Sequence, residues 1–479
     1  MIHLSWYAVK FFKKEEKMNR STIKTKLLAL LLSLSLILPL LNGCIILKRD
    51  AATKEEIIDS VSTTLLNDEH EYEFVSYYLR YWNLPRFDSE KALWAEYVFK
   101  TYYVYNGGLA KTLDHAAETA RYFVENHYDT IDITNVTAVT DAVIDSYVRT
   151  VGDLYSFYRT PEASNDFTTD MSGKFGGIGV VVEYDHENES ISVSSVILDS
   201  PAEAAGFKVG DKIIAVDGHT VEEIGYLNAV NYVRGEIGTN VVVRVMRDGT
   251  ELSLTAKRAE IVERVVDSYV TEEGYGYILI TDFKSITFEQ FVEAYDALVQ
   301  QNVKGFIFDL RYNPGGYVDS VCNVLSYLLP TDNVIMSCHY KTGDPTVLST
   351  KDDVHPKTGA VADSVMKLPA VVLCNEYTAS AGEIFTAALR DYNKSGLLVA
   401  TTVGTKTFGK GIMQSSIYYK TIDKSSLTFT SAYYNPPSGV NYQGIGITPD
   451  ITVENTETED RQLDAAIKEL TRLINEAIK

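Results

Sequence analysis

The stretch AVVLCNEYTASAGEIF, residues 370–385, organises the rest of the chain. Its first part, Val371 to Cys374, is an apolar run with the length of a short buried strand, and polar turn residues follow it. After a turn of small residues, apolar side chains recur at helical spacing, namely Ile384, Phe385, Ala388, Leu389 and Tyr392. The pattern therefore predicts a strand, a sharp turn and a helix.

Ser380 stands where this turn enters the predicted helix. Free backbone N–H groups and the helix dipole favour negative charge there, so the position suits a nucleophilic hydroxyl. The segment from Ser380 to Gln414 contains no histidine to act as a base. Lys410 can serve instead if burial lowers its pKa, because desolvation disfavours the ammonium. Gln414 is four residues further on, where it could share a face with the lysine and orient its amine.

These residues also have a simpler interpretation. Ser380 would be an ordinary helix cap and Lys410 a solvated loop charge, since both residue types are common in a chain of 479 residues. Spacing alone does not decide between the two interpretations.

The segments TASAGEIF, residues 378–385, and GTKTFGKGIMQ, residues 404–414, resemble the two signatures of carboxyl-terminal processing (tail-specific) proteases. These are serine proteases with a Ser-Lys-Gln catalytic group and an embedded PDZ domain. The resemblance implies that Ser380 is the nucleophile, Lys410 the general base and Gln414 its orienting partner. It covers about residues 140–455, with a threonine in place of serine at Thr378 and an added loop from Asp391 to Leu397.

Residues 259–455 are predicted to form the catalytic domain. Apolar runs such as YILI, residues 277–280, and GFIFDL, residues 305–310, alternate with helical patterns, which is typical of a mixed, mainly parallel α/β sheet. The second run leads into RYNPGG, whose glycines let the backbone approach a ligand. In the resembled family the matching loop supplies oxyanion-hole donors, which implies a backbone N–H from Gly315 or Gly316 paired with that of Ala381.

Residues 171–258 show short alternating strands separated by turns, and they are predicted to form a β-sandwich-like PDZ domain. SPAEAAG and VGDKIIAVDG, residues 200–206 and 209–218, resemble the PDZ helix-and-strand signature. The loop before them would expose consecutive N–H groups that bind a terminal carboxylate while the peptide adds as a strand. The candidate peptide-binding residues are Gly177, Ile178, Gly179 and Val180.

Helical patterns flank these two domains. Residues 52–170 are predicted to form an N-terminal helical region whose dense aromatic residues indicate packing. Residues 456–479 are predicted to form an amphipathic C-terminal helix. Because the resembled proteases often pair through their N-terminal helices, a homodimer is a further expectation. Within the first region, DLYSFYRTPE, residues 153–162, resembles the family's stretch just ahead of the PDZ domain.

Residues 1–44 have the pattern of an export signal. A basic segment precedes an apolar run from Leu27 to Leu41, as in a secretory signal peptide. LNGC, residues 41–44, resembles a bacterial lipobox, in which Cys44 would be lipidated. Counted on to Leu47, the run is also long enough for an uncleaved transmembrane anchor. Both alternatives place the body in the cell envelope, tethered to the membrane on its extracytoplasmic side.

Composition excludes several classes of function. The net charge of −21, with no basic stretch beyond the N-terminus, argues against a nucleic-acid partner, because phosphate binding needs clustered Lys and Arg. Four cysteines in so long a chain do not form a disulfide framework. Cys322, Cys338 and Cys374 are expected to be core thiols. No Cys or His spacing indicates a metal site, and we expect no cofactor.

The sequence thus predicts a multidomain α/β, membrane-tethered serine endopeptidase. It would bind protein or peptide substrates with free C-termini through its PDZ domain and cleave them by a Ser-Lys(-Gln) mechanism. The alternative is a catalytically silent PDZ scaffold lipoprotein, but such a protein should have lost Ser380 or Lys410. A transport-type ligand-binding lipoprotein would explain the anchor but neither the PDZ domain nor the paired signatures. Peptide binding to the PDZ domain is expected to gate the protease.

Overall fold

The computed structural model describes residues 53–67, 75, 79, 84–105, 112–185, 190–351, 366–420 and 422–477. The predicted export segment, with Cys44, lies outside the described residues. Within the part that is described, no helix is both long and apolar enough to cross a membrane.

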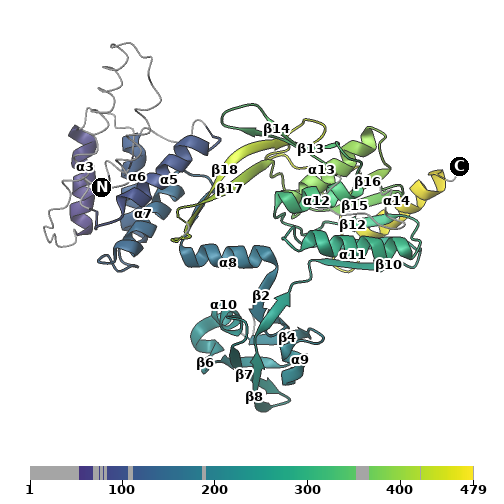
Figure 1. Cartoon of the computed structure of the whole chain (residues 1–479), viewed down its shortest axis with the longest axis horizontal. Helices are drawn as coiled ribbons and strands as arrows, with labels where there is room; N and C mark the ends of the chain where they lie inside the picture. The colour runs from purple at the N-terminus through teal and green to yellow at the C-terminus, as the bar shows by residue number, and fades with distance from the viewer. Residues whose placement is uncertain are drawn as a thin grey trace, which may run out of the picture.

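A six-stranded sheet lies at the centre of the predicted catalytic domain, in the order β10-β11-β12-β15-β16-β19 (Figure 1). Its five last-named strands run parallel, and β10 pairs antiparallel with β11. This arrangement confirms the predicted mixed, mainly parallel α/β fold. The strands are β10 (Val266–Val270), β11 (Gly276–Ile280), β12 (Phe306–Asp309), β15 (Ala370–Cys374), β16 (Ala400–Gly404) and β19 (Ile451–Thr452).

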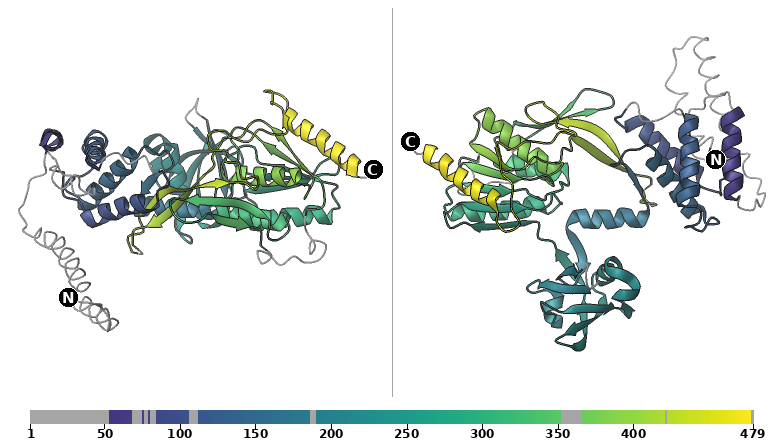
Figure 2. Two further views of the ribbon diagram at one scale, coloured as in Figure 1. Left: turned by 90° about the horizontal axis from the view of Figure 1, so that it is seen from above. Right: turned by 180° about the vertical axis from the view of Figure 1, so that it is seen from behind.

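Helices cover both faces of this sheet (Figure 2). Successive strand side chains point to opposite faces, so Phe306 and Phe308 pack under α11, α12 and α13, whereas Ile307 packs against α14. The covering helices are α11 (Thr287–Gln300), α12 (Val318–Leu328), α13 (Ala381–Lys394) and the C-terminal α14 (Arg461–Ala477). Because α13 runs to Lys394, the first four residues of the added segment, expected to be loop from Asp391, are helical instead.

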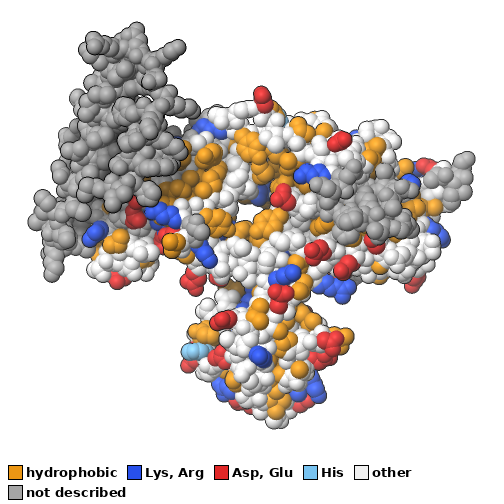
Figure 3. Space-filling model, in the orientation of Figure 1, with side chains coloured by type: hydrophobic (Ala, Val, Ile, Leu, Met, Phe, Trp, Pro, Cys, Tyr) orange, Lys and Arg blue, Asp and Glu red, His pale blue; other side chains and the backbone are white. Residues whose placement is uncertain are grey.

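A second, antiparallel sheet joins the catalytic domain to the N-terminal region, and the sequence analysis did not predict it. Its order is β1-β18-β13-β14, with β17 on the other edge of β18. These strands are β1 (Phe157–Arg159), β13 (Val334–Tyr340), β14 (Thr346–Ser349), β17 (Ile412–Tyr418) and β18 (Ser426–Asn435). In the view of Figure 3 the molecule is hollowed between β17, β18 and helix α8 (Pro161–Ser172).

The N-terminal helices share one core with this second sheet. Leu427 and Phe429 of β18 are buried among the apolar side chains of the helices, so the bundle and the strand cannot separate without exposing that core. The helices are α3 (Lys54–Asn67), α5 (Ser89–Tyr102), α6 (Thr112–Asn126) and α7 (Val136–Thr150).

Two adjacent strands, β2 (Lys174–Gly177) and β9 (Ala259–Val262), connect the PDZ domain to the rest of the protein (Figure 1). Its own sheet has the order β3-β4-β5-β7-β8, with β6 on β5. These elements are β3 (Val180–Asp185), β4 (Ser190–Val196), β5 (Lys212–Val216), β6 (His219–Thr220), β7 (Asn240–Arg247) and β8 (Thr250–Lys257), with helices α9 (Pro201–Ala205) and α10 (Val221–Val233).

The three cysteines within the described residues are free thiols. Cys338 and Cys374 are buried and Cys322 is partly buried against the core. Burial raises the pKa of Cys338 to about 11 and that of Cys374 to about 12. They therefore remain protonated at neutral pH, as expected of core thiols.

Candidate active site

Ser380 occupies a strained turn between β15 and α13. Its φ of 51° and ψ of −114° lie outside the regions that a residue with a side chain normally adopts. Such a conformation costs about 1–3 kcal/mol, so the surrounding structure must impose it. Part of that support comes from Thr378, whose hydroxyl donates to the carbonyl of Leu310 at 2.8 Å and accepts from the N–H of Asn375. A serine could make the same bonds, which explains why the threonine is accommodated.

Glu383 connects the two catalytic signatures. Its carboxylate is fully buried and accepts hydrogen bonds from four groups, the backbone N–H of Ser380 (3.0 Å), Gly409 (2.7 Å) and Lys410 (2.8 Å) and the hydroxyl of Thr407. Burial raises the pKa of this carboxyl, and the four donors oppose the shift. The backbone N–H groups of Ser380 and Lys410 donate to the same oxygen of Glu383. The distance between their two nitrogens is therefore at most the sum of these two hydrogen-bond distances.

This role of Glu383 was not predicted from the sequence, although a signal was present. Ser380 and Glu383 form the S-x-x-E pattern of a helix capping box, in which the glutamate reaches back to the N–H of the capping residue. That pattern predicts the bond to Ser380. It does not predict the other three donors, which arrive from a segment more than twenty residues away.

Lys410 is half-buried in the extended segment before β17. Its Nζ lies over the ring of Tyr155, 4.8 Å from the ring centroid. Burial lowers the pKa of Lys410, as a general base at neutral pH requires, while the negative charges of Asp153 and Glu383 oppose that shift. Among the described residues, the ammonium makes no hydrogen bond to Ser380 or Gln414.

Gln414 lies on β17 opposite Thr430 of β18, just after a bulge in the pairing of the two strands. Its side-chain amide donates to the Thr430 hydroxyl at 3.3 Å. The structure thus brings the Ser380 and Lys410 backbones together but does not join Lys410 to Gln414 in this arrangement. The orienting role of Gln414 stays a prediction.

The glycine loop packs directly on Ser380, the candidate nucleophile. A Cβ on Gly315, whose φ is 111°, would lie 2.7 Å from the Cβ of Ser380 and 3.0 Å from the backbone nitrogen of Ala381. The N–H of Gly315 donates to the side-chain oxygen of Asn313 at 2.8 Å. Within the described part of the chain, the N–H groups of Gly316 and Ala381 have no acceptor, so these two remain available as a donor pair.

Asn313 holds the glycine loop to its neighbours and was not singled out from the sequence. It is fully buried, and its amide donates to the carbonyl of Ile280 at 2.8 Å while its own carbonyl accepts from the N–H of Ala379. The loop is therefore tied both to β11 and to the turn that carries Ser380. In the sequence, Asn-Pro-Gly-Gly alone indicates only a turn.

The candidate peptide-binding residues lie at the open edge of the PDZ sheet. Gly177 ends β2, Ile178 is buried, and Val180 begins β3, which is an edge strand. Gly179 has a φ of 85°, and a Cβ there would lie 2.4 Å from Ser200, so only glycine fits. An edge strand beside a helix suits strand addition by a peptide, and Tyr184 of β3 contacts Tyr226 of α10 at 4.9 Å between ring centroids.

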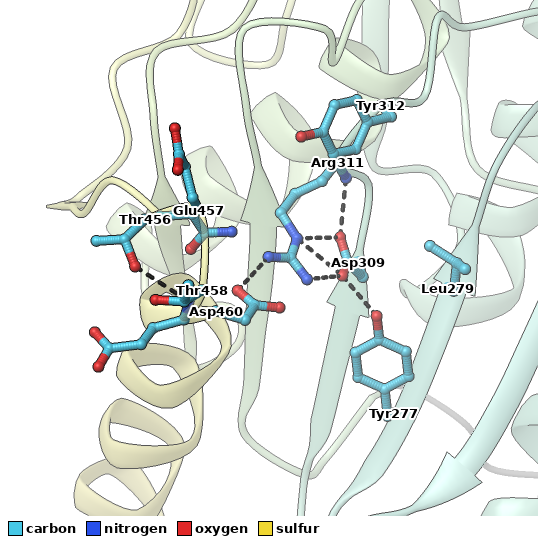
Figure 4. A pocket seen from close by; sticks show the side chains of 11 residues that line it. Tyr277, Leu279, Asp309, Arg311, Tyr312, Thr456, Glu457, Thr458 and Asp460 are labelled. Carbon is cyan, nitrogen blue, oxygen red and sulfur yellow. Dashed lines mark hydrogen bonds and ion pairs between the residues drawn. The ribbon is translucent and has the colours of Figure 1, made fainter. Parts of the chain in front are cut away.

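A separate pocket of about 430 Å³ lies on the α14 side of the sheet (Figure 4). Arg311 dominates it and donates to both oxygens of Asp309 and to Asp460, and Tyr277 also donates to Asp309. These carboxylates raise the pKa of Arg311 even though burial opposes the shift. Because Arg311, Asp309 and Asp460 are paired with one another, we assign this cluster a structural role. The described residues hold no group of three or more His, Cys, Asp or Glu suited to a metal ion.

The strained serine at a strand-to-helix turn, the nearby lysine and the appended PDZ domain define a PDZ-containing protein with a serine-peptidase type of α/β domain. Residues 274–453 match the model of "Peptidase family S41" and residues 176–257 that of the "PDZ domain". These two matches confirm the resemblance found in the sequence.

Curated relatives support this assignment. The chain is 32% identical over 323 residues to a "Probable CtpA-like serine protease" of Staphylococcus haemolyticus, an alignment of 67% of this chain and 62% of that protein. It is 33% identical over 316 residues to the protein of the same description from Staphylococcus aureus strain N315, covering 66% and 60%. The chain thus spans about three fifths of the length of these relatives.

Among solved structures, the chain aligns with a photosystem II D1 C-terminal processing protease at 23% identity and a TM-score of 0.45. This alignment covers 80% of this chain and 96% of that one.

We predict that Gly315→Ala abolishes cleavage while leaving the protein folded. The added methyl group would contact Ser380 and the Ala381 N–H, so it would distort the nucleophile and the donor pair. Gly210→Ala is a matched control, because Gly210 has a similar positive φ of 90° but open space around its Cβ position. Cleavage of a fluorescent casein and the thermal unfolding midpoint would be measured for both. A fully active Gly315→Ala variant would contradict this account of the loop.

Proposed function

We propose that the chain is a serine endopeptidase that binds protein tails with free C-termini through its PDZ domain and cleaves them by a Ser-Lys mechanism. The observation that supports it best is the hydrogen bonding of Ser380 and Lys410 to one buried carboxylate oxygen of Glu383. A scaffold that cuts nothing would have no need to hold a strained serine beside a lysine of lowered pKa.

The proposed mechanism uses groups of this chain alone. Neutral Lys410 takes the proton of the Ser380 hydroxyl as the serine oxygen bonds to the scissile carbonyl carbon. The resulting oxyanion accepts hydrogen bonds from Gly316 and Ala381. Lys410 then returns the proton to the leaving amine, and the C–N bond breaks. In the second half, Lys410 takes a proton from water as the water oxygen bonds to the acyl carbon. The ester C–O bond then breaks, and Lys410 returns the proton to the Ser380 oxygen. Gln414 orients the lysine.

The decisive experiment uses the body from residue 52 onward, incubated with casein. We expect cleavage by the wild type and a loss of at least about 100-fold in Lys410→Ala, the usual minimum for a lost general base. Ser380→Ala removes the nucleophile and should lose at least as much. Lys406→Ala, which changes an exposed lysine of the same segment, should keep the wild-type rate. Wild-type kcat/KM should rise with pH, with a midpoint below the ordinary lysine value, because only the neutral amine is a base.

Two results would count against the mechanism. Full activity of Lys410→Ala would exclude the lysine as the base. Absence of cleavage by the wild type, even with added C-terminal peptides, would favour the silent scaffold.

We further propose that the PDZ domain gates the site. Lys284 is buried at the junction, where its Nζ donates to Glu263 (2.7 Å) beyond β9 and to Asp170 (3.4 Å) of α8. The preceding residue, Phe283, donates its N–H to the carbonyl of Gly315 at 2.8 Å and accepts from the N–H of Tyr317. Phe283 and Lys284 therefore connect the junction with the PDZ domain to the glycine loop that carries Gly315 and Gly316. A peptide that moves the PDZ domain at this junction would change the shape of that loop.

The gate can be tested by removing the PDZ domain. Gly177 and Ala259 are paired across β2 and β9. A two-residue Asn-Gly turn can therefore replace residues 178–258 and still join the two strands of the remaining protein. A peptide with a free C-terminal carboxylate should raise the wild-type rate more than its amidated form. The deletion variant should not respond to either peptide. If the deletion changes neither rate nor substrate preference, the gate is wrong.

The anchor is proposed on the sequence of residues 1–44, as a lipid on Cys44 that holds the body on the extracytoplasmic side of the membrane. In bacteria given an alkyne-labelled fatty acid, the full chain should take up label, whereas Cys44→Ser should not and should leave the membrane fraction. A Cys44→Ser protein that stays in the membrane would instead support the uncleaved transmembrane segment. Sedimentation of the soluble body would test the expected homodimer.

A further inference from the structure

Residues 153–156 lie outside both matched domain segments, and the function proposed above gives them no role. They come from the N-terminal region, yet the structure places them against the catalytic lysine. The ring centroid of Tyr155 is 4.8 Å from Lys410 Nζ, within the range at which an aromatic face attracts a cation.

Several bonds fix Tyr155 in this position. Asp153 accepts from the N–H of Tyr155 at 3.1 Å and from the hydroxyl of Ser156 at 2.6 Å, which closes a tight local turn. Two residues beyond Tyr155 the chain becomes β1, where Phe157 pairs with Thr428 of β18. The placement of the ring thus follows from strand pairing and does not depend on a loose contact.

The same aspartate is connected to the partner predicted for the lysine. Asp153 also accepts from the Thr430 hydroxyl at 2.6 Å, and that hydroxyl is the acceptor for the Gln414 amide. One carboxylate therefore positions both Tyr155 and, through Thr430, the side chain of Gln414.

Burial lowers the pKa of Lys410, but the negative and aromatic groups around it oppose that shift and favour the protonated form. The titratable groups that face it are Tyr155 and Asp153 from the N-terminal segment, Glu383 from α13 and Tyr434 from β18, whose hydroxyl donates to the Lys410 carbonyl. Among the described residues that face it there is no second cation. The Nζ of Lys410 lies over the Tyr155 ring and, in the part of the chain that the structure describes, makes no hydrogen bond to Ser380.

We propose that Tyr155 is a positioning residue for the general base: its ring binds the protonated Lys410 side chain away from Ser380, and Asp153 holds that ring in place. This inference rests on the proposed function. When Lys410 releases its proton to solvent, the attraction to the ring is lost, and the neutral amine turns to Ser380, where it accepts the hydroxyl proton. The N-terminal region is thereby part of the catalytic site.

The first test is the pH dependence of kcat/KM for Tyr155→Leu. Removal of the ring takes a stabilising partner from the ammonium, so the pKa of Lys410 should fall. The rise of kcat/KM with pH should therefore have its midpoint about 0.5 to 1 pH unit lower. Tyr155→Phe keeps an aromatic face and should keep this midpoint near its wild-type position. Tyr128→Leu is the matched control, because it removes a ring 5.6 Å from Lys54 Nζ, remote from the site.

A second readout is independent of activity. In the Ser380→Ala background, pulses of acetic anhydride at increasing pH, followed by peptide mass spectrometry, give the titration midpoint of Lys410, with exposed Lys406 as the internal reference. Tyr155→Leu should lower this midpoint by the same amount as the kinetic midpoint. Asp153→Asn should lower it too, because it removes a negative charge. If Tyr155→Leu does not fold, the Tyr155→Met midpoint decides, because Asp153→Asn acts through its charge whether or not the ring binds the ammonium.

The outcomes separate the two proposals. A lower labelling midpoint supports the role of Tyr155 even if the wild type cleaves nothing. A merely structural role would reduce rates in Tyr155→Leu with both midpoints unchanged, and that result would overturn the inference. Equal shifts in Tyr155→Leu and Tyr155→Phe would also overturn it, since the ring face would then not be responsible.

Discussion

The buried carboxylate of Glu383 is the interaction on which the site depends. Its four donors belong to both catalytic signatures, so the nucleophile turn and the lysine segment are held by one group. A buried charge is costly unless it is hydrogen-bonded, and a donor left without its acceptor costs about 1–3 kcal/mol. Removal of this carboxylate would therefore release both segments at once. The same bonds help to offset the strain of the Ser380 backbone, which is imposed by its surroundings on both sides.

The N-terminal region completes the peptidase domain. β18 shares its core residues Leu427 and Phe429 with the N-terminal helices, and the same strand carries Thr430 beside Gln414. The geometry of the lysine side of the site is consequently determined by residues far apart in the chain. A segment limited to the matched residues 274–453 would lack β1, and with it the contact between Tyr155 and Lys410.

The elements that depend on contacts between residues near in sequence were predicted correctly from the sequence. The strand at Val371–Cys374, the helix after Ser380 and the parallel core were predictable from apolar periodicity and length, and the signatures identified Ser380 and Lys410 as candidates. The second sheet was not, because β1 has three residues and its partner β18 follows some 270 residues later. The roles of Asn313 and Asp153 were not predictable for the same reason, because each acts through contacts with segments that only the fold brings near. The Gly315 N–H, a candidate donor in the sequence, is bonded to Asn313.

The pairing of Gly177 with Ala259 means that the PDZ domain leaves and rejoins the body at nearly one point. A unit inserted in this way is a cassette: its loss or exchange requires no rearrangement of the peptidase fold around it. Under the proposed function, mutations within it would change which protein tails are bound while the serine, the lysine and their shared carboxylate stay in place.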